Sequence, residues 1–400
     1  MRGALSTSAG VGVVMVAAAL SQFFAMILLG RTSEAALGQV SLVLSTATVV
    51  GTFALVGQSN AFARILARGD AARLAWPVQL RRALLESVVL SAAMGLVASW
   101  ALSMSWMATG VVVVAAAGLA VSELVASGVL RPLGKFFSAS LLLRFWSLAL
   151  GLAVVGLFLA GGLTKDSSLL AFGVVAGVGV VLGPVALIRA PSGEEPLPST
   201  WRRTGFMFWS IQLCLIATRH LDRLVLGGVL GEETLAKYQA VLTLLMAFDL
   251  ASTALGFVLL PKLARSARVN APRLGSMVGA VAAAGVVGYL LLAEPVLHWA
   301  YDGHFDDSAF LISWFVAAGV LKVIYALPSA LLGGRTSDRA LAWFAGLNVP
   351  LVVVHATLTA YLAHVDGVRG AAIALVIAWG LRLVVSIGLV WRFWEPERVS

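Results

Sequence analysis

Long apolar runs without charge are the feature that most constrains how this chain can fold. Segment 11–30 contains no charged residue, and segment 111–121 consists only of valine, alanine, glycine and leucine. A helix of about 20 apolar residues spans the roughly 30 Å hydrocarbon core of a bilayer. Such runs recur along the 400 residues, which are 60% hydrophobic and only 12% charged. The sequence therefore predicts an all-α polytopic membrane protein.

We expect about twelve spans, which a polar stretch divides into two sets of about six. The first set is predicted at 8–30, 39–60, 83–103, 106–127, 139–160 and 168–189. The second set is predicted at 204–228, 236–260, 276–299, 309–332, 340–363 and 371–391. The first run exceeds the roughly 7–15 apolar residues of a signal peptide, so we expect a retained helix. The expected division is an N-terminal lobe at 1–190, a cytoplasmic linker at 191–203 and a C-terminal lobe at 204–400.

Basic residues fall mainly in alternate loops between these spans. One set of loops carries Arg64, Arg68, Arg73, Arg81, Arg82, Arg131, Lys135, Arg189, Arg202, Arg203, Lys262, Arg265, Arg268, Arg273, Arg335 and Arg339. The opposite set carries Arg31, Lys165, Lys237 and Arg369, with the acidic Asp302, Asp306 and Asp307. By the positive-inside rule both termini and the linker face the cytoplasm. The net charge of +9 is thus mostly a topology signal, and no nucleic-acid partner is expected.

The two halves also share residues at a fixed offset of 198 positions. This offset aligns Gly30 with Gly228 and Glu34 with Glu232. Without a gap it also aligns Leu37 with Leu235, Val43 with Val241, Leu44 with Leu242, Ser45 with Thr243 and Arg64 with Lys262. An even number of spans in each half keeps both halves in the same orientation. We therefore expect a parallel repeat that builds two lobes around a central cavity.

Charged residues inside the span at 204–228 need a polar environment, because each costs about 2.5–3.5 kcal/mol near the middle of a bilayer. Arg219, Asp222 and Arg223 follow Gln212 at helical spacing, so the four share one polar stripe. Asp222 can neutralise Arg219 as a purely structural pair, or the excess cation can line a cavity. His220 points about 100° away from Arg219 and suits packing as well as proton transfer.

Other deep charges are also mostly basic. Lys322 lies near the middle of its span, as does Arg382, whereas Arg144 lies about one turn inside its span and can instead reach the headgroups. Asp249, in mid-span, is the expected partner for Arg219, Arg223 or Lys322. Glu86 and Glu123 lie near span ends and are expected at the interface, as are tryptophans such as Trp100, Trp106, Trp201, Trp299 and Trp391.

Two segments resemble a known family. Segment 30–70 is similar to the first loop and second helix of bacterial polysaccharide flippases, with Gly57, Ser59 and Asn60 leading to Arg64. In the second half, the Asp222 and Arg223 pair, Tyr238, and Pro261 within 259–265 fit the same pattern. The chain therefore resembles the O-antigen flippases of the multidrug, oligosaccharidyl-lipid and polysaccharide exporter (MOP) superfamily.

This resemblance implies a two-lobed flippase in the bacterial inner membrane, carrying undecaprenyl-diphosphate-linked oligosaccharide for O-antigen or exopolysaccharide. Polysaccharide polymerase or ligase machinery would then be a partner. A cationic cavity would bind the diphosphate by alternating access, since arginine suits phosphate. The candidate substrate-binding residues are Arg219, Arg223, Lys322, Arg382, Arg144 and Gln212, with Asp222 and Asp249 for charge pairing or ion coupling.

Alternatives follow from the same residues. A multidrug antiporter of the same superfamily needs buried carboxylates, yet segment 8–30 has no acid, which leaves Asp222 and Asp249. The lipid II flippase branch typically has about fourteen spans, more than the sequence provides. A ligase or polymerase would need a large outer loop, and a scaffold would need only paired charges. The sequence contains no phosphate-binding loop, metal-ligand spacing or nucleophile motif, so neither an enzyme nor a cofactor is expected.

Overall fold

The computed structural model describes residues 2–68, 74–187, 193–197, 201–252, 255, 271–335 and 338–393. Regular structure in these residues is helical, apart from one isolated bridge between Leu74 and Glu195. Nine helices in this described part are long and apolar enough to cross a membrane. The all-α membrane fold is therefore confirmed, while the count of about twelve spans stays a prediction.

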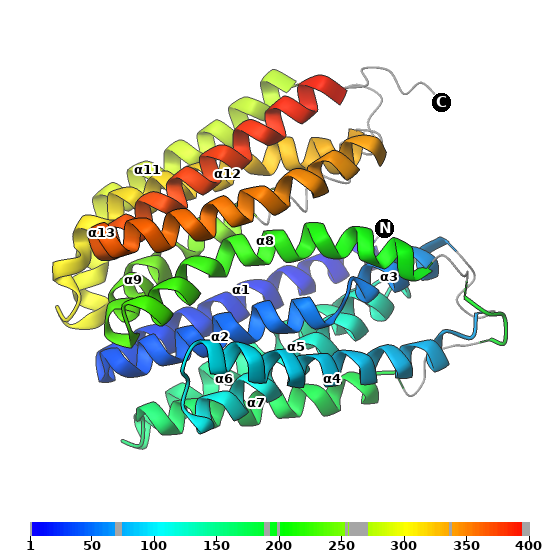
Figure 1. Cartoon of the computed structure of the whole chain (residues 1–400), viewed down its shortest axis with the longest axis horizontal. Coiled ribbons are helices and arrows are strands. Elements are labelled where there is room, and N and C mark those ends of the chain that lie inside the picture. The colour runs from blue at the N-terminus through cyan, green and yellow to red at the C-terminus, as the bar shows by residue number, and fades with distance from the viewer. Residues whose placement is uncertain are drawn as a thin grey trace. The chain divides into compact units, whose positions relative to one another are not determined.

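The chain divides into two compact units, residues 1–228 and 229–400. Unit 1 contains α1 (Arg2–Thr32), α2 (Glu34–Ala54), α3 (Gln58–Arg68), α4 (Trp76–Ala101), α5 (Trp106–Val125), a π-helical turn η1 (Ala126–Leu130), α6 (Phe136–Leu159), α7 (Lys165–Val185) and α8 (Trp201–Val229). They are coloured from blue to green in Figure 1. The predicted lobe boundary near residue 204 stays a prediction, and α8 makes its described contacts with unit 1.

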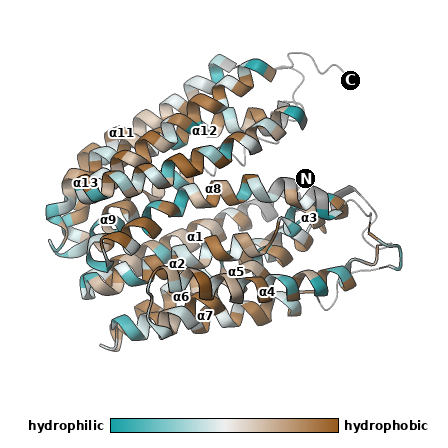
Figure 2. Cartoon of the chain, viewed as in Figure 1, coloured by the Kyte–Doolittle hydropathy of each residue, from teal (hydrophilic) through white to brown (hydrophobic). Residues whose placement is uncertain are grey.

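The helices of unit 1 differ in how much of their surface the protein covers. In their most apolar stretches α2 is 78% buried and α5 is 67% buried, whereas α1, α4 and α6 are each 28% buried. Large apolar side chains such as Leu85 and Leu152 stay exposed on the outer helices. Brown apolar residues run along these helices in Figure 2, and teal hydrophilic residues lie mainly near their ends. This distribution is expected where lipid replaces water around the bundle.

Tryptophans near helix ends mostly follow the expected interfacial pattern. Trp100, Trp106 and Trp391 are more than four-fifths exposed, as interfacial anchors should be. The expectation was wrong for Trp201, which is 7% exposed and packs against Phe62 with ring centroids 5.3 Å apart. The start of α8 lies against α3, so this ring belongs to the protein core.

The break between α2 and α3 places two left-handed residues inside a predicted span. Val56 has φ of 45° and Gly57 has φ of 69°. A β-carbon on Gly57 would lie 1.8 Å from the carbonyl oxygen of Gly205 in α8, so the two backbones touch at a point where no side chain fits. Glycine is therefore required at position 57 by both conformation and space.

Unit 2 contains α9 (Glu232–Leu244), α11 (Ala271–Tyr301), a 3₁₀ turn η2 (Asp306–Leu311), α12 (Ile312–Arg335) and α13 (Asp338–Phe393). The long α13 is interrupted at Asp366 and Gly367, where φ of Gly367 is 56°. This interruption falls between the predicted spans at 340–363 and 371–391. The orange and red parts of α13 in Figure 1 are the two resulting helices.

Helix starts agree with the repeat predicted from the sequence. Glu34 is the first residue of α2, and Glu232 is the first residue of α9, at the offset that aligned the two halves. Each helix follows directly on a long apolar helix, α1 or α8. The two halves thus share this helix start, while the parallel repeat as a whole stays a prediction.

We predict that Gly57→Ala destabilises the protein by about 2–5 kcal/mol, because it adds left-handed strain and overpacking against Gly205. Thermal unfolding of the purified protein in detergent measures the loss. Gly134→Ala is the matched control, since Gly134 also has positive φ (77°) but nothing lies within 4 Å of its β-carbon position. Its expected loss is about 1 kcal/mol. Equal losses at the two positions would contradict a role for the contact between α2–α3 and α8.

Candidate functional site

The charged stripe of α8 contacts α2 through a histidine. Asp222 is 1% exposed and accepts a hydrogen bond from the backbone N–H of Arg223 (2.9 Å). The Nη1 atom of Arg223 lies 3.2 Å from Nδ1 of His220, and the same ring nitrogen lies 3.1 Å from Oγ of Ser45 in α2. In this arrangement Nδ1 accepts the hydrogen bond from the guanidinium, which requires a ring that is not doubly protonated.

Gln212, at the other end of the stripe, faces the break between α2 and α3. Its Oε1 accepts a hydrogen bond from Nδ2 of Asn60 in α3 (2.8 Å). One turn earlier, the indole N–H of Trp209 donates to the carbonyl of Phe53 near the end of α2 (3.1 Å). Irregular backbone inside a membrane is tolerated where neighbouring helices satisfy it, and α8 does so here.

Arg144 of α6 belongs to the same neighbourhood. It interacts electrostatically with the carboxylate of Glu123 in α5 and with the guanidinium groups of Arg131 and Arg219. Arg144 and Arg219 thus come from separate helices to within electrostatic range of each other. Two of the predicted cations of unit 1, Arg144 and Arg219, therefore interact electrostatically, and Glu123 is the carboxylate that attracts Arg144.

Unit 2 has a second group of deep charges, built around Trp379. The Nζ atom of Lys322 lies 5.3 Å from the centre of this ring, and Cζ of Arg382 lies 5.7 Å from it. Arg382 is 1% exposed and donates from Nη2 to Oδ1 of Asn348 (2.8 Å). Aromatic rings attract cations over their faces, so Trp379 stabilises both charges.

Asp249 pairs with one of the three cations that the sequence offered. Its Oδ1 lies 2.5 Å from Nζ of Lys322, and the side chains are 43% and 12% exposed. Ser252, one turn further along the chain, donates to the backbone carbonyl of Lys322 (3.2 Å). The acid and base are therefore joined by two nearby contacts between the same segments.

A helix break and two glycines hold Asp249 in this position. The helical hydrogen bonding of α9 changes at Leu245, and the hydroxyl of Tyr289 in α11 donates to the carbonyl of Leu244. The ring of Phe248 then fills space that only glycine leaves free at Gly285 and Gly319, and it stacks on Tyr289 with centroids 4.8 Å apart. Since Lys322 follows Gly319 by one helical turn, Phe248 fixes the register in which Asp249 meets it.

Sequence reasoning missed several members of these groups. Asn60 appeared only as part of a family pattern, and Ser45 only as part of the repeat. Asn348 and Trp379 carried a usable signal, because each is a polar or amphipathic residue in the middle of a predicted span. No group of three or more histidine, cysteine, aspartate or glutamate side chains that could hold a metal occurs in the described residues.

Comparison with known proteins defines the fold. No family model matches the chain, and no curated protein matches its sequence. The lipid II flippase MurJ in an inward closed conformation has a TM-score of 0.70 at 13% identity, covering 96% of this chain and 87% of MurJ. A multidrug resistance MATE family transporter of the MOP superfamily, inward-facing, has a TM-score of 0.61 at 16% identity, with 94% and 93% covered. The eukaryotic MATE transporter AtDTX14 has a TM-score of 0.58 at 15% identity, with 97% and 96% covered.

These likenesses extend over nearly the whole chain. The chain therefore shares the fold of these MATE and MurJ structures. The fold implied by the sequence resemblance is confirmed, whereas membership of the MOP superfamily and of its polysaccharide branch stays a prediction.

We predict that Asp249 and Lys322 are energetically coupled. Asp249→Asn or Lys322→Met alone should lower the unfolding temperature, because each leaves one charge without its partner, and the double variant should regain much of the loss. A double-mutant cycle of thermal unfolding is expected to give about 1–3 kcal/mol of coupling.

The matched control for this cycle is the pair of Lys237 and Asp307, which has the same 2.5 Å separation but is more exposed, at 36% and 58%. Its coupling should stay below about 1 kcal/mol. The same coupling at both pairs would show that the position of Lys322 in the bundle has no special weight.

Proposed function

We propose that the protein is a flippase that moves undecaprenyl-diphosphate-linked oligosaccharide, an O-antigen or exopolysaccharide repeat unit, from the cytoplasmic to the outer leaflet by alternating access. The observation that carries this proposal is the set of deep basic side chains in both units: Arg144, Arg219 and Arg223 in unit 1, and Lys322 and Arg382 in unit 2. Membrane proteins keep such residues where they meet a polar substrate or one another.

The chemistry of these residues suits a diphosphate. A guanidinium presents several donors in a fixed plane and binds phosphate oxygens in pairs. Arg382 is oriented by the amide oxygen of Asn348 and by the ring of Trp379. Lys322 is already joined to Asp249, so in this proposal it orients the ring of Trp379 and is the weaker phosphate ligand.

The energetics of outward movement favour an anionic substrate. With the cell interior negative, moving one negative charge outward gains about 2.3 kcal/mol per 100 mV. The polyprenyl chain would stay in lipid while the sugars and diphosphate cross between two rocking lobes. The likeness to MurJ, a lipid II flippase by name, supports a lipid-linked substrate class. In this proposal the protein lies in the bacterial inner membrane with both termini cytoplasmic, and polymerase or ligase machinery acts on its product.

A second candidate is a cation-coupled drug antiporter, and the likeness to two MATE transporters supports it equally. Its specific observation is Asp222, an acid that is 1% exposed on α8. Against it, Asp249 is joined to Lys322, and α1 (Arg2–Thr32) contains no aspartate or glutamate. A drug cation would therefore have fewer carboxylates to bind than a phosphate would have cations. A ligase, a polymerase or a scaffold has no comparable observation in its favour.

We predict that combining Arg219→Gln, Arg223→Gln, Lys322→Gln and Arg382→Gln lowers export by at least about tenfold, because the diphosphate loses its counter-charges. The measurement is the amount and sidedness of lipid-linked oligosaccharide in cells lacking the gene and complemented with each variant. Lys135→Gln with Arg339→Gln is the control, since both side chains are exposed. Membrane level and monodispersity of each variant exclude misfolding. Undiminished export in the quadruple variant would contradict the flippase proposal.

The two candidates also differ in their response to loss of an acid. Asp222→Asn should leave efflux of a cationic dye unchanged in the same cells, because the flippase carries no drug. The antiporter instead requires that this variant retain the dye, while lipid-linked sugars stay normal. The strain that lacks the gene is the reference for both candidate functions. It should accumulate lipid-linked sugar on the cytoplasmic face only if the protein is the flippase.

A further inference from the structure

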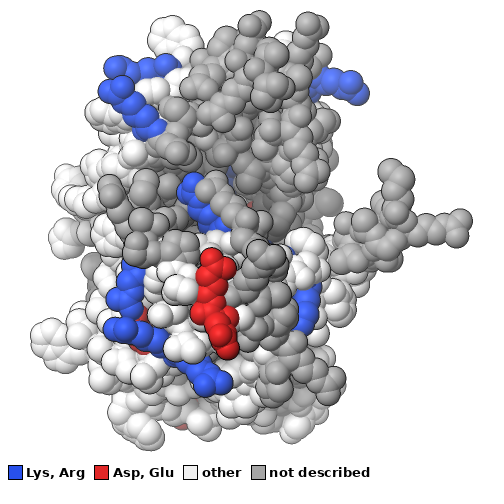
Figure 3. Space-filling view, turned by 90° about the vertical axis from the view of Figure 1, so that its right-hand side faces the viewer, with Lys and Arg blue, Asp and Glu red and all other residues white. Residues whose placement is uncertain are grey.

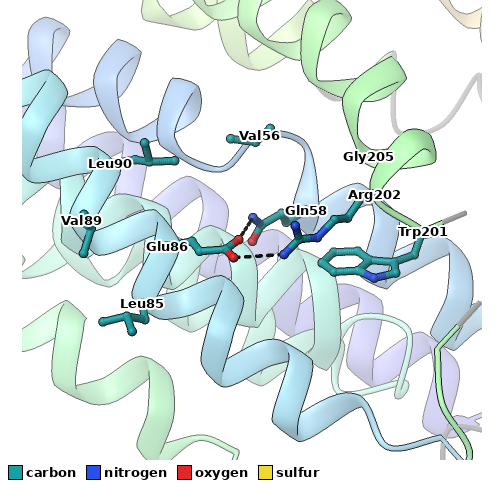
Figure 4. Close-up of a pocket in the computed structure, with 9 residues that line it drawn as sticks. All are labelled: Val56, Gln58, Leu85, Glu86, Val89, Leu90, Trp201, Arg202 and Gly205. Atoms are coloured by element: carbon teal, nitrogen blue, oxygen red, sulfur yellow. Dashed lines mark hydrogen bonds and ion pairs between the residues drawn. The ribbon is translucent and has the colours of Figure 1, made fainter. Parts of the chain in front are cut away.

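Unit 1 contains a cavity of about 470 Å³ that neither group of deep charges uses. Its wall combines apolar residues of α4 with the α2–α3 break and the first residues of α8 (Figure 4). The lining residues are Val56, Gln58, Leu85, Glu86, Val89, Leu90, Trp201, Arg202 and Gly205. Its size falls in the range of about 300–1,000 Å³ that small-molecule and cofactor sites occupy.

One end of this cavity is polar and carries an excess of positive charge. Glu86 Oε1 lies 2.9 Å from Nε of Arg82 and 3.0 Å from Nη2 of Arg202, and Glu86 Oε2 accepts a hydrogen bond from Gln58 (3.2 Å). In Figure 4 the side chains of Gln58, Glu86 and Arg202 point toward one another. Two guanidinium groups therefore share one carboxylate. The arginine side chains are 66% and 54% exposed, so further N–H donors face outward.

The rest of the cavity is apolar and reaches the outer surface of α4. Leu85 is 66% exposed and Val89 is 58% exposed, whereas Trp201 on the inner side is 7% exposed. Such side chains on an outer helix of a membrane protein face lipid. The cavity thus joins a lipid-facing apolar wall to a cationic end.

The polar end lies at the predicted cytoplasmic side of the membrane. Arg82 is in the first turns of α4 and Arg202 is the second residue of α8, and both belong to the basic segments predicted to face the cytoplasm. In the lower part of Figure 3, basic side chains lie on either side of a smaller acidic area. The cytoplasmic leaflet carries anionic lipids that attract such residues.

We propose that this cavity binds one anionic glycerophospholipid of the cytoplasmic leaflet, with its phosphate on Arg82 and Arg202 and one acyl chain along Val56, Leu85 and Val89. In the described group, Arg82 and Arg202 exceed Glu86 by one positive charge, which matches the single negative charge of a phosphodiester. A diphosphate would place at least one more negative charge beside Glu86, so the transported lipid is the poorer match. The site does not depend on the proposed substrate.

A comparison within the protein supports the role of the charges. Unit 2 has a cavity of about 410 Å³ lined by Gly275, Val278, Gly279, Ile324, Leu327, Pro328, Leu331, Leu383, Ile387 and Val390. Its lining contains no charged side chain, so it can hold an apolar chain but cannot select a headgroup. The cavity of unit 1 differs from it by the Glu86, Arg82 and Arg202 group.

The bound lipid would stabilise the contact between α4 and the start of α8. Arg202 contacts α4 through Glu86, and a phosphate bridging Arg82 and Arg202 would add a further connection. Exposed ion pairs contribute little by themselves. A lipid that joins both helices therefore changes the rigidity with which α8 enters the bundle.

The test is native mass spectrometry of the full-length protein in detergent, titrated with phosphatidylglycerol or phosphatidylcholine. We expect phosphatidylglycerol to be retained at least about fivefold better, and Arg202→Gln to lower its retention about fivefold. Arg81→Gln is the matched control, because Arg81 is the exposed neighbour of Arg82, whereas Arg82 is the residue that pairs with the lining residue Glu86. Val89→Trp should fill the apolar part and abolish specific retention. Thermal unfolding establishes that each variant is folded.

Three results would overturn the proposal. Equal retention of the two phospholipids would remove the charge argument, and an equal loss in Arg81→Gln would reduce it to general surface attraction. If an equal or lower concentration of undecaprenyl diphosphate displaced phosphatidylglycerol, and Val89→Trp also abolished retention of undecaprenyl diphosphate, the cavity would belong to the transported lipid instead. None of these results bears on export by the deep cations, so the flippase proposal is tested separately.

Discussion

The exclusion of water from the bilayer is the constraint on which the rest of this structure depends. A charge or a free backbone group inside the hydrocarbon needs a partner from the protein. The deep charges accordingly occur in groups: Arg223 contacts His220 on α8, and Arg382 and Lys322 lie beside Trp379 in unit 2. Groups of this kind are costly to maintain for packing alone, since an apolar side chain of similar size would pack at least as well. Their presence points to a task that requires charge.

Helix breaks are subject to the same constraint as the deep charges. Backbone groups freed at a break must be satisfied by a neighbouring helix, and the Trp209 indole does this near the end of α2, as the Tyr289 hydroxyl does at Leu244. Each break therefore fixes the helix that supports it. Because Gln212 follows Trp209 by one turn and Asp249 follows Phe248, the side chains of the candidate site are positioned by the same contacts that stabilise the breaks.

Apolar periodicity was sufficient to predict the helical class. The offset of 198 positions aligned Glu34 with Glu232, which are the first residues of α2 and α9, although the spans were predicted to begin only at 39 and 236. Deep charges were also visible, because charge is rare in apolar runs. Partners were not predictable: Glu86, expected at the interface, contacts Arg202, which is 116 positions away. Likewise Asp249 had three candidate cations. It pairs with Lys322 because Phe248 packs against Gly285 and Gly319, a contact that no local sequence pattern reveals. The span at 236–260 was predicted as one helix, yet α9 ends at Leu244. The hydroxyl of Tyr289 donates to the carbonyl of Leu244 and so satisfies a backbone group at this break.

Whether a transport site binds anions or cations depends on which of its charged side chains are neutralised by ion pairs. An ion pair such as Asp249 with Lys322 cancels both charges, so neither is well placed to bind an ionic substrate. The Arg382 guanidinium is oriented differently, by the amide oxygen of Asn348 and the ring of Trp379. A drug antiporter would need the reverse, a carboxylate held by neutral donors. Asp222 accepts the backbone N–H of Arg223, and Arg219 and Arg223 lie within one turn of it on α8. The field around Asp222 therefore favours anions, and the same helix that offers the best argument for a drug site argues more strongly for phosphate.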